Sequence, residues 1–391
     1  MEEKHENLHY NHCRRAKFRK STTKLCITKG VKSLLGGVKV ETVLYDHKKF
    51  CNMKMKSSWT APLKEKIKYL FNFKKYRQRY KWFYERLSFY QEFNGKYINA
   101  SPYTMEKGKL LSPQINDLYD YFIVGSDQVW HPEWISGNED KFFLLFASKE
   151  KRIAYAASFG LPQIPEEKRE IFYEGINGIS YISVRENQGA KIIKKLTGRD
   201  VPVVVDPTLL LDKTEWCQIE KKPKWDVPNR YVLNYFLGDI PEEIQKDMRE
   251  QAKKYGMEII SIYDINDPNC RKIGPSEFIY LIHHCNFMYT DSFHGTVFSI
   301  LMRKPFYVIN RVQEGMGSMN SRIDTLLQLF SFSERYLKAE AKYQHGSDIF
   351  DIDFNLVGEI QKKEWKRSSA YLRGTMNIEG FGEENDTSID K

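Results

Sequence analysis

Short apolar runs alternate with amphipathic segments along the chain from about residue 115 onward. The runs are rich in β-branched and aromatic residues, and helical periodicity fills the spaces between them, which predicts repeated βα units. Several runs are apolar at nearly every position, as in parallel strands that helices cover on both faces. The predicted strands span residues 120–125, 152–158, 181–184, 201–205, 230–236, 257–263, 285–290 and 305–310. This pattern predicts an α/β fold with two Rossmann-like lobes built on parallel sheets.

A change of polarity marks the predicted boundary between the lobes. The segment DPTLLLDKTEW, which begins at Asp206, is followed by the polar KKPKWDVPN. We therefore assign residues 1–205 to an N-terminal lobe and residues 206–373 to a C-terminal lobe. Residues 374–391 are polar and show no apolar periodicity, so we expect this tail to be disordered.

The first hundred residues are less regular. Residues 25–35, Gly36–Gly37 and residues 38–46 have the pattern of a helix, a turn and a strand, whereas residues 1–24 contain no convincing first strand. Residues 66–87 mix cations with aromatic rings at near-helical spacing and predict an amphipathic helix. Its basic side is either a solvated face or a contact with an anionic membrane surface. Nucleic acid is not an expected partner, because no zinc-finger, RRM or KH motif is present.

Charge is concentrated near the start of the chain. Residues 1–100 hold 24 Lys and Arg against 8 Asp and Glu, a net charge of +16, so the other 291 residues carry −6 of the total of +10. No apolar run approaches the roughly 20 residues of a spanning helix, and the start lacks the apolar segment of a signal peptide. We therefore expect a cytoplasmic protein whose basic region lies near a membrane surface in one of the two readings above.

Neither a metal nor a cofactor is predicted. The six cysteines form no CxxC pair, which argues against disulfides and against a zinc site. The segment HHC at residues 283–285, together with His294, also fails to predict a metal site. We interpret it as the start of a strand, in which neighbouring side chains point to opposite faces.

Polar motifs follow five of the predicted strands. They are GSDQVW at 125–130, SFG at 158–160, Arg185–Glu186, DPT at 206–208 and TDSFHG at 290–295. In open α/β sheets, ligands bind beyond the carboxyl ends of the strands, so these motifs predict one shared cleft. The alternative is that each motif makes an ordinary turn or helix cap.

The same segments carry a resemblance to a known family. VGSDQVWHPEW, IAYAASFG, ISVRENQGA, VVDPTLLLDKTEW, GPSEFIYLIHHCNFMYTDSFHGTVFSILMRKPF and NSRIDTLLQLF occur in this order over about residues 115–340. Together they resemble the polysaccharide pyruvyl transferase family of bacterial capsule and exopolysaccharide clusters. The resemblance implies a fold similar to GT-B glycosyltransferases, with the acceptor on the N-terminal lobe and the donor on the C-terminal lobe. It also implies transfer of a pyruvyl group from phosphoenolpyruvate, as donor substrate, to a saccharide hydroxyl pair as a cyclic ketal.

Three residues are candidates for catalysis. His294 titrates near neutral pH and follows Asp291 and Ser292 at a predicted helix start, where N–H groups favour an anion, and the resemblance also places a functional histidine there. Arg185 has the fork that matches a carboxylate or phosphate, and Asp127 is a candidate base for an acceptor hydroxyl. We assign substrate contacts to Gly125, Ser126, Gln128, Ser158, Asp291, Ser292, Gly295 and Arg322. Arg303 is a reserve anion ligand, with a charged helix end as its alternative role.

The chain departs from the family pattern at two places. Ser292 and Phe293 precede His294, where better-characterised members have an arginine and a leucine, so one cation is missing there. The expected first strand is also missing. Two other functions therefore stay open: a GT-B-like glycosyltransferase that uses a nucleotide sugar, and a catalytically inactive saccharide-binding paralogue.

Overall fold

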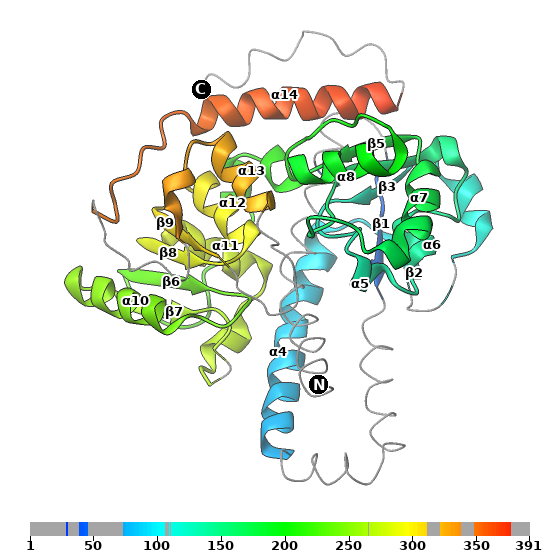
Figure 1. Cartoon of the computed structure of the whole chain (residues 1–391). Helices are drawn as coiled ribbons and strands as arrows, with labels where there is room; N and C mark the ends of the chain where they lie inside the picture. The colour runs from blue at the N-terminus through cyan, green and yellow to red at the C-terminus, as the bar shows by residue number, and fades with distance from the viewer. Residues whose placement is uncertain are drawn as a thin grey trace.

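The computed structural model describes residues 29, 39–45, 73–105, 109, 111–264, 266–310, 321–337 and 348–376. The side chains of the long helix α4 (Phe73–Tyr97) are described from Glu85 onward. All strand pairings in these residues are parallel and form three sheets flanked by helices (Figure 1). The α/β fold with Rossmann-like lobes is confirmed, and its arrangement is consistent with GT-B.

The N-terminal lobe contains a sheet in the order β3-β4-β5. Its strands are β3 (Phe122–Gly125), β4 (Arg152–Ala157) and β5 (Tyr181–Val184), and its helices are α5 (Pro132–Ile135), α6 (Glu139–Phe142), α7 (Arg169–Asn177) and α8 (Asn187–Thr197). The predicted strand at 201–205 is wrong in extent, because only Val203 bridges to Val184. Pro202 has no N–H to donate, which prevents a regular ladder at this edge.

The C-terminal lobe contains a five-stranded sheet in the order β10-β9-β8-β6-β7. Its strands are β6 (Tyr231–Tyr235), β7 (Glu258–Ser261), β8 (Phe287–Thr290), β9 (Phe306–Ile309) and β10 (Tyr336–Leu337). Its helices are α9 (Lys213–Cys217), α10 (Glu242–Lys254), α11 (Pro275–His284), α12 (Phe293–Leu301) and α13 (Ser321–Leu329). Every residue of β6, β8 and β9 is buried, which explains their continuous apolar sequence.

Six short 3-10 helices connect these elements within the described residues. They are η1 (Pro113–Leu118), η2 (Lys149–Lys151), η3 (Glu166–Lys168), η4 (Pro207–Leu210), η5 (Asn269–Lys272) and η6 (Ser333–Arg335). The most important of them is η4, because it carries the chain out of the N-terminal lobe and starts at the buried Asp206.

A separate pair of strands forms the third sheet. β1 (Thr42–Tyr45) pairs with β2 (Ala100–Met105), and β1 lies within the predicted strand at 38–46. Of the predicted helix at 25–35, only Lys29 is described, and it is helical; residues 1–24 lie outside the described residues.

Helix α4 overlaps the basic amphipathic segment predicted at 66–87. Most side chains of that segment lie outside the described residues. The described part of α4 packs on the C-terminal lobe, because Tyr90 and Phe93 join its core and Nε of buried Arg86 donates to the carbonyl of Ile273 at 3.0 Å. None of the helices in the described ranges is both long and apolar enough to cross a bilayer.

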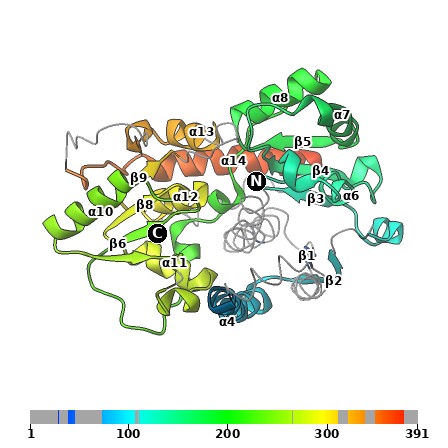
Figure 2. The ribbon, with the colours of Figure 1, turned by 60° about the horizontal axis from the view of Figure 1, so that its bottom comes forward.

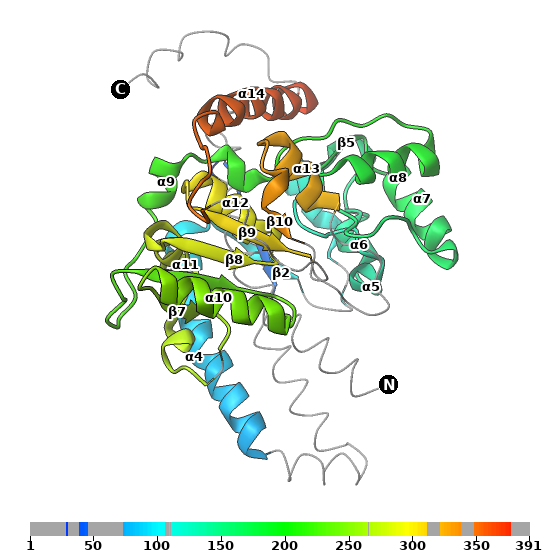
Figure 3. The same cartoon turned by 60° about the vertical axis from the view of Figure 1, so that its left-hand side comes forward.

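The last helix, α14 (Val357–Thr375), spans both lobes (Figures 1 and 3). Gln361 donates to the carbonyls of Leu209 and Leu211, and the hydroxyl of Tyr371 donates to the carbonyl of Ala154 in β4. The predicted tail at 374–391 is therefore wrong in its start, because Gly374 and Thr375 are helical and the burial of the preceding Leu372 holds this turn in place. The rest of the tail lies outside the described residues, and the exact lobe boundary stays a prediction.

Candidate active site

Four buried side chains meet between the lobes, three from strand ends and one from the start of a 3-10 helix. Ser126 follows β3, Arg185 follows β5, His294 lies in the first turn of α12 after β8, and Asp206 starts η4. Helices α13 and α8, one from each lobe, contact each other beside this point (Figure 2). The carboxyl ends of parallel strands thus converge, as the positions of the polar motifs predicted.

Asp206 lies at the centre of this group. Its Oδ2 accepts hydrogen bonds from Nη1 of Arg185 at 2.6 Å and from the hydroxyl of Ser126 at 2.7 Å. Its Oδ1 accepts from the backbone N–H and the hydroxyl of Thr208 and lies 3.6 Å from Nε2 of His294. Burial by itself would raise the pKa of Asp206, but His294, Arg185 and Ser126 outweigh it and hold the pKa well below its usual range. Asp206 therefore acts as a fixed anion.

Arg185 presents a second edge that Asp206 does not use. Its Nε and Nη2 are buried and have no hydrogen-bond partner among the described residues. Oε2 of Glu186 lies 3.9 Å from Nε, and Oδ1 of Asp127 lies 4.0 Å from Nη2, beyond hydrogen-bond distance. Because Nε and Nη2 share one edge of the guanidinium, they form a fork that fits two oxygens of a carboxylate or phosphate.

The ring of Phe293 packs against this guanidinium. The guanidinium carbon of Arg185 lies 4.2 Å from the centroid of its ring, and that of Arg322 lies 5.9 Å from the same centroid. Arg322 is buried near the start of α13. The chain has no arginine at position 292, but Arg322 brings a second guanidinium to the site from α13.

Glu186 directly follows Arg185 and is not among the site residues expected from the sequence. Its Oε1 accepts from the hydroxyl of Ser158 at 2.9 Å and from the N–H of Phe159 at 3.3 Å. Burial raises the pKa of Glu186, although Arg185 and Arg322 oppose this shift. Ser158 therefore contacts the site by its hydrogen bond to Glu186, and the buried carboxyl is a candidate proton donor that only tertiary packing reveals.

At the start of α12, several residues predicted to bind substrate instead make hydrogen bonds or packing contacts within the protein. Asp291 accepts from the N–H groups of Leu237 and Gly238, and the hydroxyl of Ser292 caps the helix by accepting from the N–H of Gly295. A Cβ on Gly295 would lie 2.3 Å from Oγ1 of Thr290, so this glycine permits close packing of α12 on β8. These contacts favour the alternative of turns and caps for Asp291, Ser292 and Gly295.

The loop after β3 is shaped by its contacts with the loop after β4. Gly125 has a φ of 124°, and a Cβ there would lie 2.1 Å from the carbonyl oxygen of Tyr155. The carbonyl of Asp127 accepts from the N–H of Ser158, and buried Gln128 lies so close to Gly160 that a Cβ on Gly160 would be 1.9 Å from its Nε2. Gly125 and Gln128 therefore determine the conformation of the loop that carries Ser126 and Asp127.

Two further residues complete the survey of the site. Arg303 is exposed, has a φ of 53° and lies in the turn directly after α12, which agrees with its alternative role at a charged helix end. His131, which sequence reasoning missed, is fully buried, and burial, Arg322 and Lys168 lower its pKa to about 4. Its Nδ1 accepts from the N–H of Glu133, which leaves the hydrogen on Nε2. The motif VWHPEW contains this histidine, but only its proximity to Arg322 singles it out.

Comparison with known proteins gives a match at the level of a family. No curated protein gives a significant match. The family model described as "Polysaccharide pyruvyl transferase" matches residues 27–311, which include Ser126, Arg185, Asp206 and His294 and begin well before the region of the resemblance noted above. Since the match covers well over half of the 391 residues, this chain belongs to the polysaccharide pyruvyl transferase family.

Proposed function

We propose that the chain transfers the pyruvyl group of phosphoenolpyruvate to two hydroxyls of a saccharide and forms a cyclic ketal. The observation that carries the proposal is the buried edge of Arg185. Its Nε and Nη2 lack hydrogen-bond partners among the described residues and lie 3.9 Å and 4.0 Å from the carboxylates of Glu186 and Asp127. A buried N–H group without a hydrogen-bond partner destabilises the folded state. A bound ligand that accepts from both Nε and Nη2 would remove this cost. Phosphoenolpyruvate offers such oxygens on its carboxylate and on its phosphate.

The reaction begins with addition of a proton to the methylene carbon of phosphoenolpyruvate, which leaves an oxocarbenium centre at the next carbon. One saccharide hydroxyl bonds to that carbon and loses its proton to a base. The bond from this carbon to the phosphate oxygen then breaks, inorganic phosphate leaves, and a second hydroxyl closes the ring. The site must therefore supply a proton, accept protons from two hydroxyls and hold an anion.

The residues divide these tasks as follows. Arg185 holds the anion, and Asp206 keeps the guanidinium in place through the 2.6 Å contact to Nη1. His294, 3.6 Å from Asp206, and Glu186, whose pKa burial raises, are the candidate proton donors. Asp127, with a side chain that is 13% exposed, faces solvent more than the other acids and is the candidate base for an acceptor hydroxyl.

The acceptor and the setting belong to the same proposal. Family membership supports a saccharide acceptor in polysaccharide biosynthesis, and we propose a capsule or exopolysaccharide precursor that is lipid-linked. The net charge of +16 over residues 1–100 supports a contact with an anionic membrane surface on the cytoplasmic side. Binding of the purified chain to anionic and neutral vesicles at several salt concentrations tests that contact.

The decisive experiment combines phosphate release with product mass. Purified protein is incubated with phosphoenolpyruvate and acceptors that contain galactose, mannose or N-acetylmannosamine. We expect one added pyruvyl ketal per phosphate released. Arg185→Ala and His294→Ala should abolish turnover, Arg185→Lys should restore little because the ammonium lacks the fork, and Arg303→Ala should behave as wild type. Turnover with a nucleotide sugar instead would replace the proposal with glycosyl transfer, and ligand binding without turnover would indicate an inactive paralogue.

A further inference from the structure

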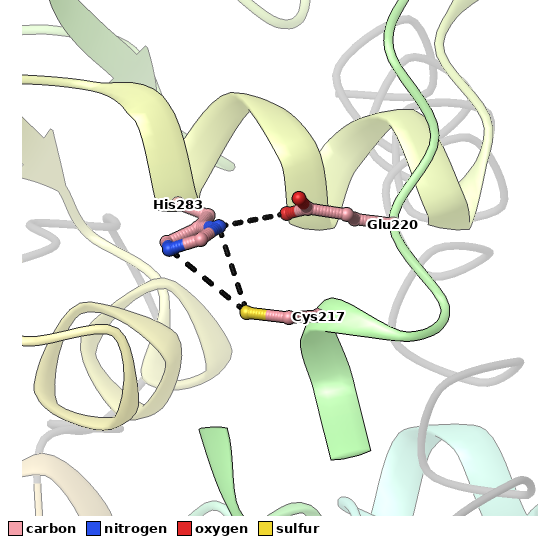
Figure 4. A group of neighbouring side chains, drawn as sticks. All are labelled: Cys217, Glu220 and His283. Carbon is pink, nitrogen blue, oxygen red and sulfur yellow. Dashed lines mark hydrogen bonds and ion pairs between the residues drawn. The ribbon is translucent and has the colours of Figure 1, made fainter. Parts of the chain in front are cut away.

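A second group of reactive side chains lies at the ends of two helices of the C-terminal lobe (Figure 4). Cys217 is the last residue of α9, His283 is in the last turn of α11, and Glu220 lies three residues beyond Cys217. Each offers one donor atom, and these atoms all lie within 4.8 Å of one another. None of the three belongs to the residues described above as the candidate active site.

Two of the three distances between donor atoms lie close to the edges of a tetrahedral metal site. Sγ of Cys217 lies 3.5 Å from Nδ1 of His283. Zinc bonds of about 2.3 Å to sulfur and about 2.0 Å to nitrogen place these two donors about 3.5 Å apart in a tetrahedron. The distance from Nδ1 to Oε2 of Glu220 is 2.9 Å, whereas the nitrogen–oxygen edge of such a site is about 3.3 Å. A small rotation of the partly exposed glutamate supplies the difference.

The surroundings favour a cation in part and oppose it in part. His283 lies in the last turn of α11, and the negative end of a helix dipole attracts positive charge. Lys213 and Lys304 lie close enough to act on the Cys217 thiol, and their charges repel a metal ion. A thiolate and a carboxylate together bring two negative charges, which offset the charges of the two lysines. The ion would then be bound by one sulfur, one nitrogen and one oxygen.

We propose that Cys217, Glu220 and His283 bind one divalent transition-metal ion of the zinc type, with water at the fourth position. A mixed set of thiolate, imidazole and carboxylate suits Zn²⁺ and Co²⁺ and does not suit Mg²⁺ or Ca²⁺. His284 contacts the other oxygen of Glu220, at 3.4 Å, and orients the carboxylate from outside the coordination sphere. The prediction of no metal site rested on strand geometry for residues 283–285, but both histidines lie in the last turn of a helix, and His283 contacts a cysteine 66 residues away.

Metal binding here would link α9 to α11. Trp216, next to Cys217, packs on Phe298 of α12 with 4.8 Å between ring centroids, and α12 carries His294 in its first turn. The ion would therefore stabilise the C-terminal lobe without touching the candidate active site. A ligand that binds only the folded state raises the melting temperature, which gives a readout independent of activity.

The test uses the full chain, freed of metal by a chelator, with Zn²⁺ and Co²⁺ as probes. We expect saturable binding of one equivalent, a thiolate-to-cobalt absorption band in the near ultraviolet and a rise in melting temperature with Zn²⁺. Cys217→Ser and His283→Gln should lose the band and the rise, Glu220→Gln should weaken both, and His284→Gln should keep them. Circular dichroism of the metal-free variants shows whether each one still folds.

Ligands of the same kind occur elsewhere in the sequence, and they supply the control. His5, His9, His12 and Cys13 lie near the start of the chain, so Cys13→Ser is the matched thiol variant. A band that survives in Cys13→Ser and disappears in Cys217→Ser supports the proposal. A band that disappears in Cys13→Ser, or one-equivalent binding that survives in Cys217→Ser, would overturn it, as would the absence of any cobalt–thiolate band in the wild type.

Discussion

The guanidinium carbon of Arg185 lies 4.2 Å from the centroid of the Phe293 ring, although the two residues belong to different lobes. Asp206 holds one edge of the same guanidinium, and the opposite edge has no hydrogen-bond partner within the described residues. The ring thus fixes the plane of the fork and Asp206 fixes its rotation. This arrangement preorganises Arg185 for an anion with two oxygens in one plane.

Removal of the Phe293 ring should weaken donor binding. A desolvated cation–π contact contributes about 1–2 kcal/mol, so Phe293→Ala should raise KM for phosphoenolpyruvate about tenfold with a smaller change in kcat. Phe293→Leu keeps an apolar contact but has no ring face, so its KM for phosphoenolpyruvate should lie between those of the wild type and Phe293→Ala. Steady-state kinetics with varied phosphoenolpyruvate measure this, and an unchanged KM in Phe293→Ala would show that the ring does not support the fork.

Asp206→Asn should destabilise the fold strongly near neutral pH. The variant leaves the buried Arg185 without its charged partner, a change that costs about 3–5 kcal/mol. The size of the loss is measured by urea unfolding at about pH 7, with Ser126→Ala as the milder variant that removes one hydrogen bond to the same carboxylate.

The same pair should show a distinct pH dependence. The pKa of Asp206 is held well below its usual range, so the ionised group contributes stability that is fully present above the unfolded-state pKa of about 3.9. This contribution is lost as the pH falls through the lower folded-state pKa. The difference in unfolding free energy between wild type and Asp206→Asn should therefore shrink below about pH 4. A difference that stays constant on acidification contradicts the low pKa.

Glu186→Gln tests the buried carboxyl as a proton donor. The amide keeps an acceptor for Ser158 and Phe159 but has no acidic proton, so kcat should fall by about 10²–10⁴ while KM changes little. Because burial raises the pKa of Glu186, its protonated form persists to higher pH than that of an exposed glutamate. If it is the donor, the wild-type rate should decline as the pH rises through that pKa, and the decline should be absent from the residual activity of the variant.

Two helical glycines should respond in opposite ways to alanine. In Gly295→Ala the new Cβ would meet Oγ1 of Thr290 at 2.3 Å, and overpacking of this kind costs about 1–3 kcal/mol. At Gly95 in α4, no atom lies within 4 Å of the Cβ position, so Gly95→Ala should raise stability by up to about 1 kcal/mol through helix propensity. Thermal unfolding of both variants measures the contrast. Equal effects would mean that α12 and β8 are not packed as tightly as described.

The sequence by itself determined the parallel α/β architecture and the place of the candidate site. Apolar periodicity reports contacts between residues near in sequence, and the carboxyl ends of parallel strands must share one edge of a sheet, so Ser126, Arg185 and His294 could be expected to converge. The resemblance of the chain to one family rested on several motifs that follow one another along the sequence. The predicted strand at 201–205 failed because a proline removes a donor that periodicity does not register.

Only the tertiary structure decided the contacts between segments far apart in the chain. The hydrogen bond between Arg185 and Asp206, the stacking of Phe293 with Arg185, the return of α14 to β4 and the approach of Cys217 to His283 each depend on how the packed cores orient separate elements. Local sequence carries little information about such pairs, because their geometry is set by the burial of many apolar side chains together. Burial by itself raises the pKa of both Asp206 and Glu186, but the net shifts have opposite directions. Asp206 accepts a hydrogen bond from Arg185 at 2.6 Å, whereas Oε2 of Glu186 lies 3.9 Å from the same guanidinium.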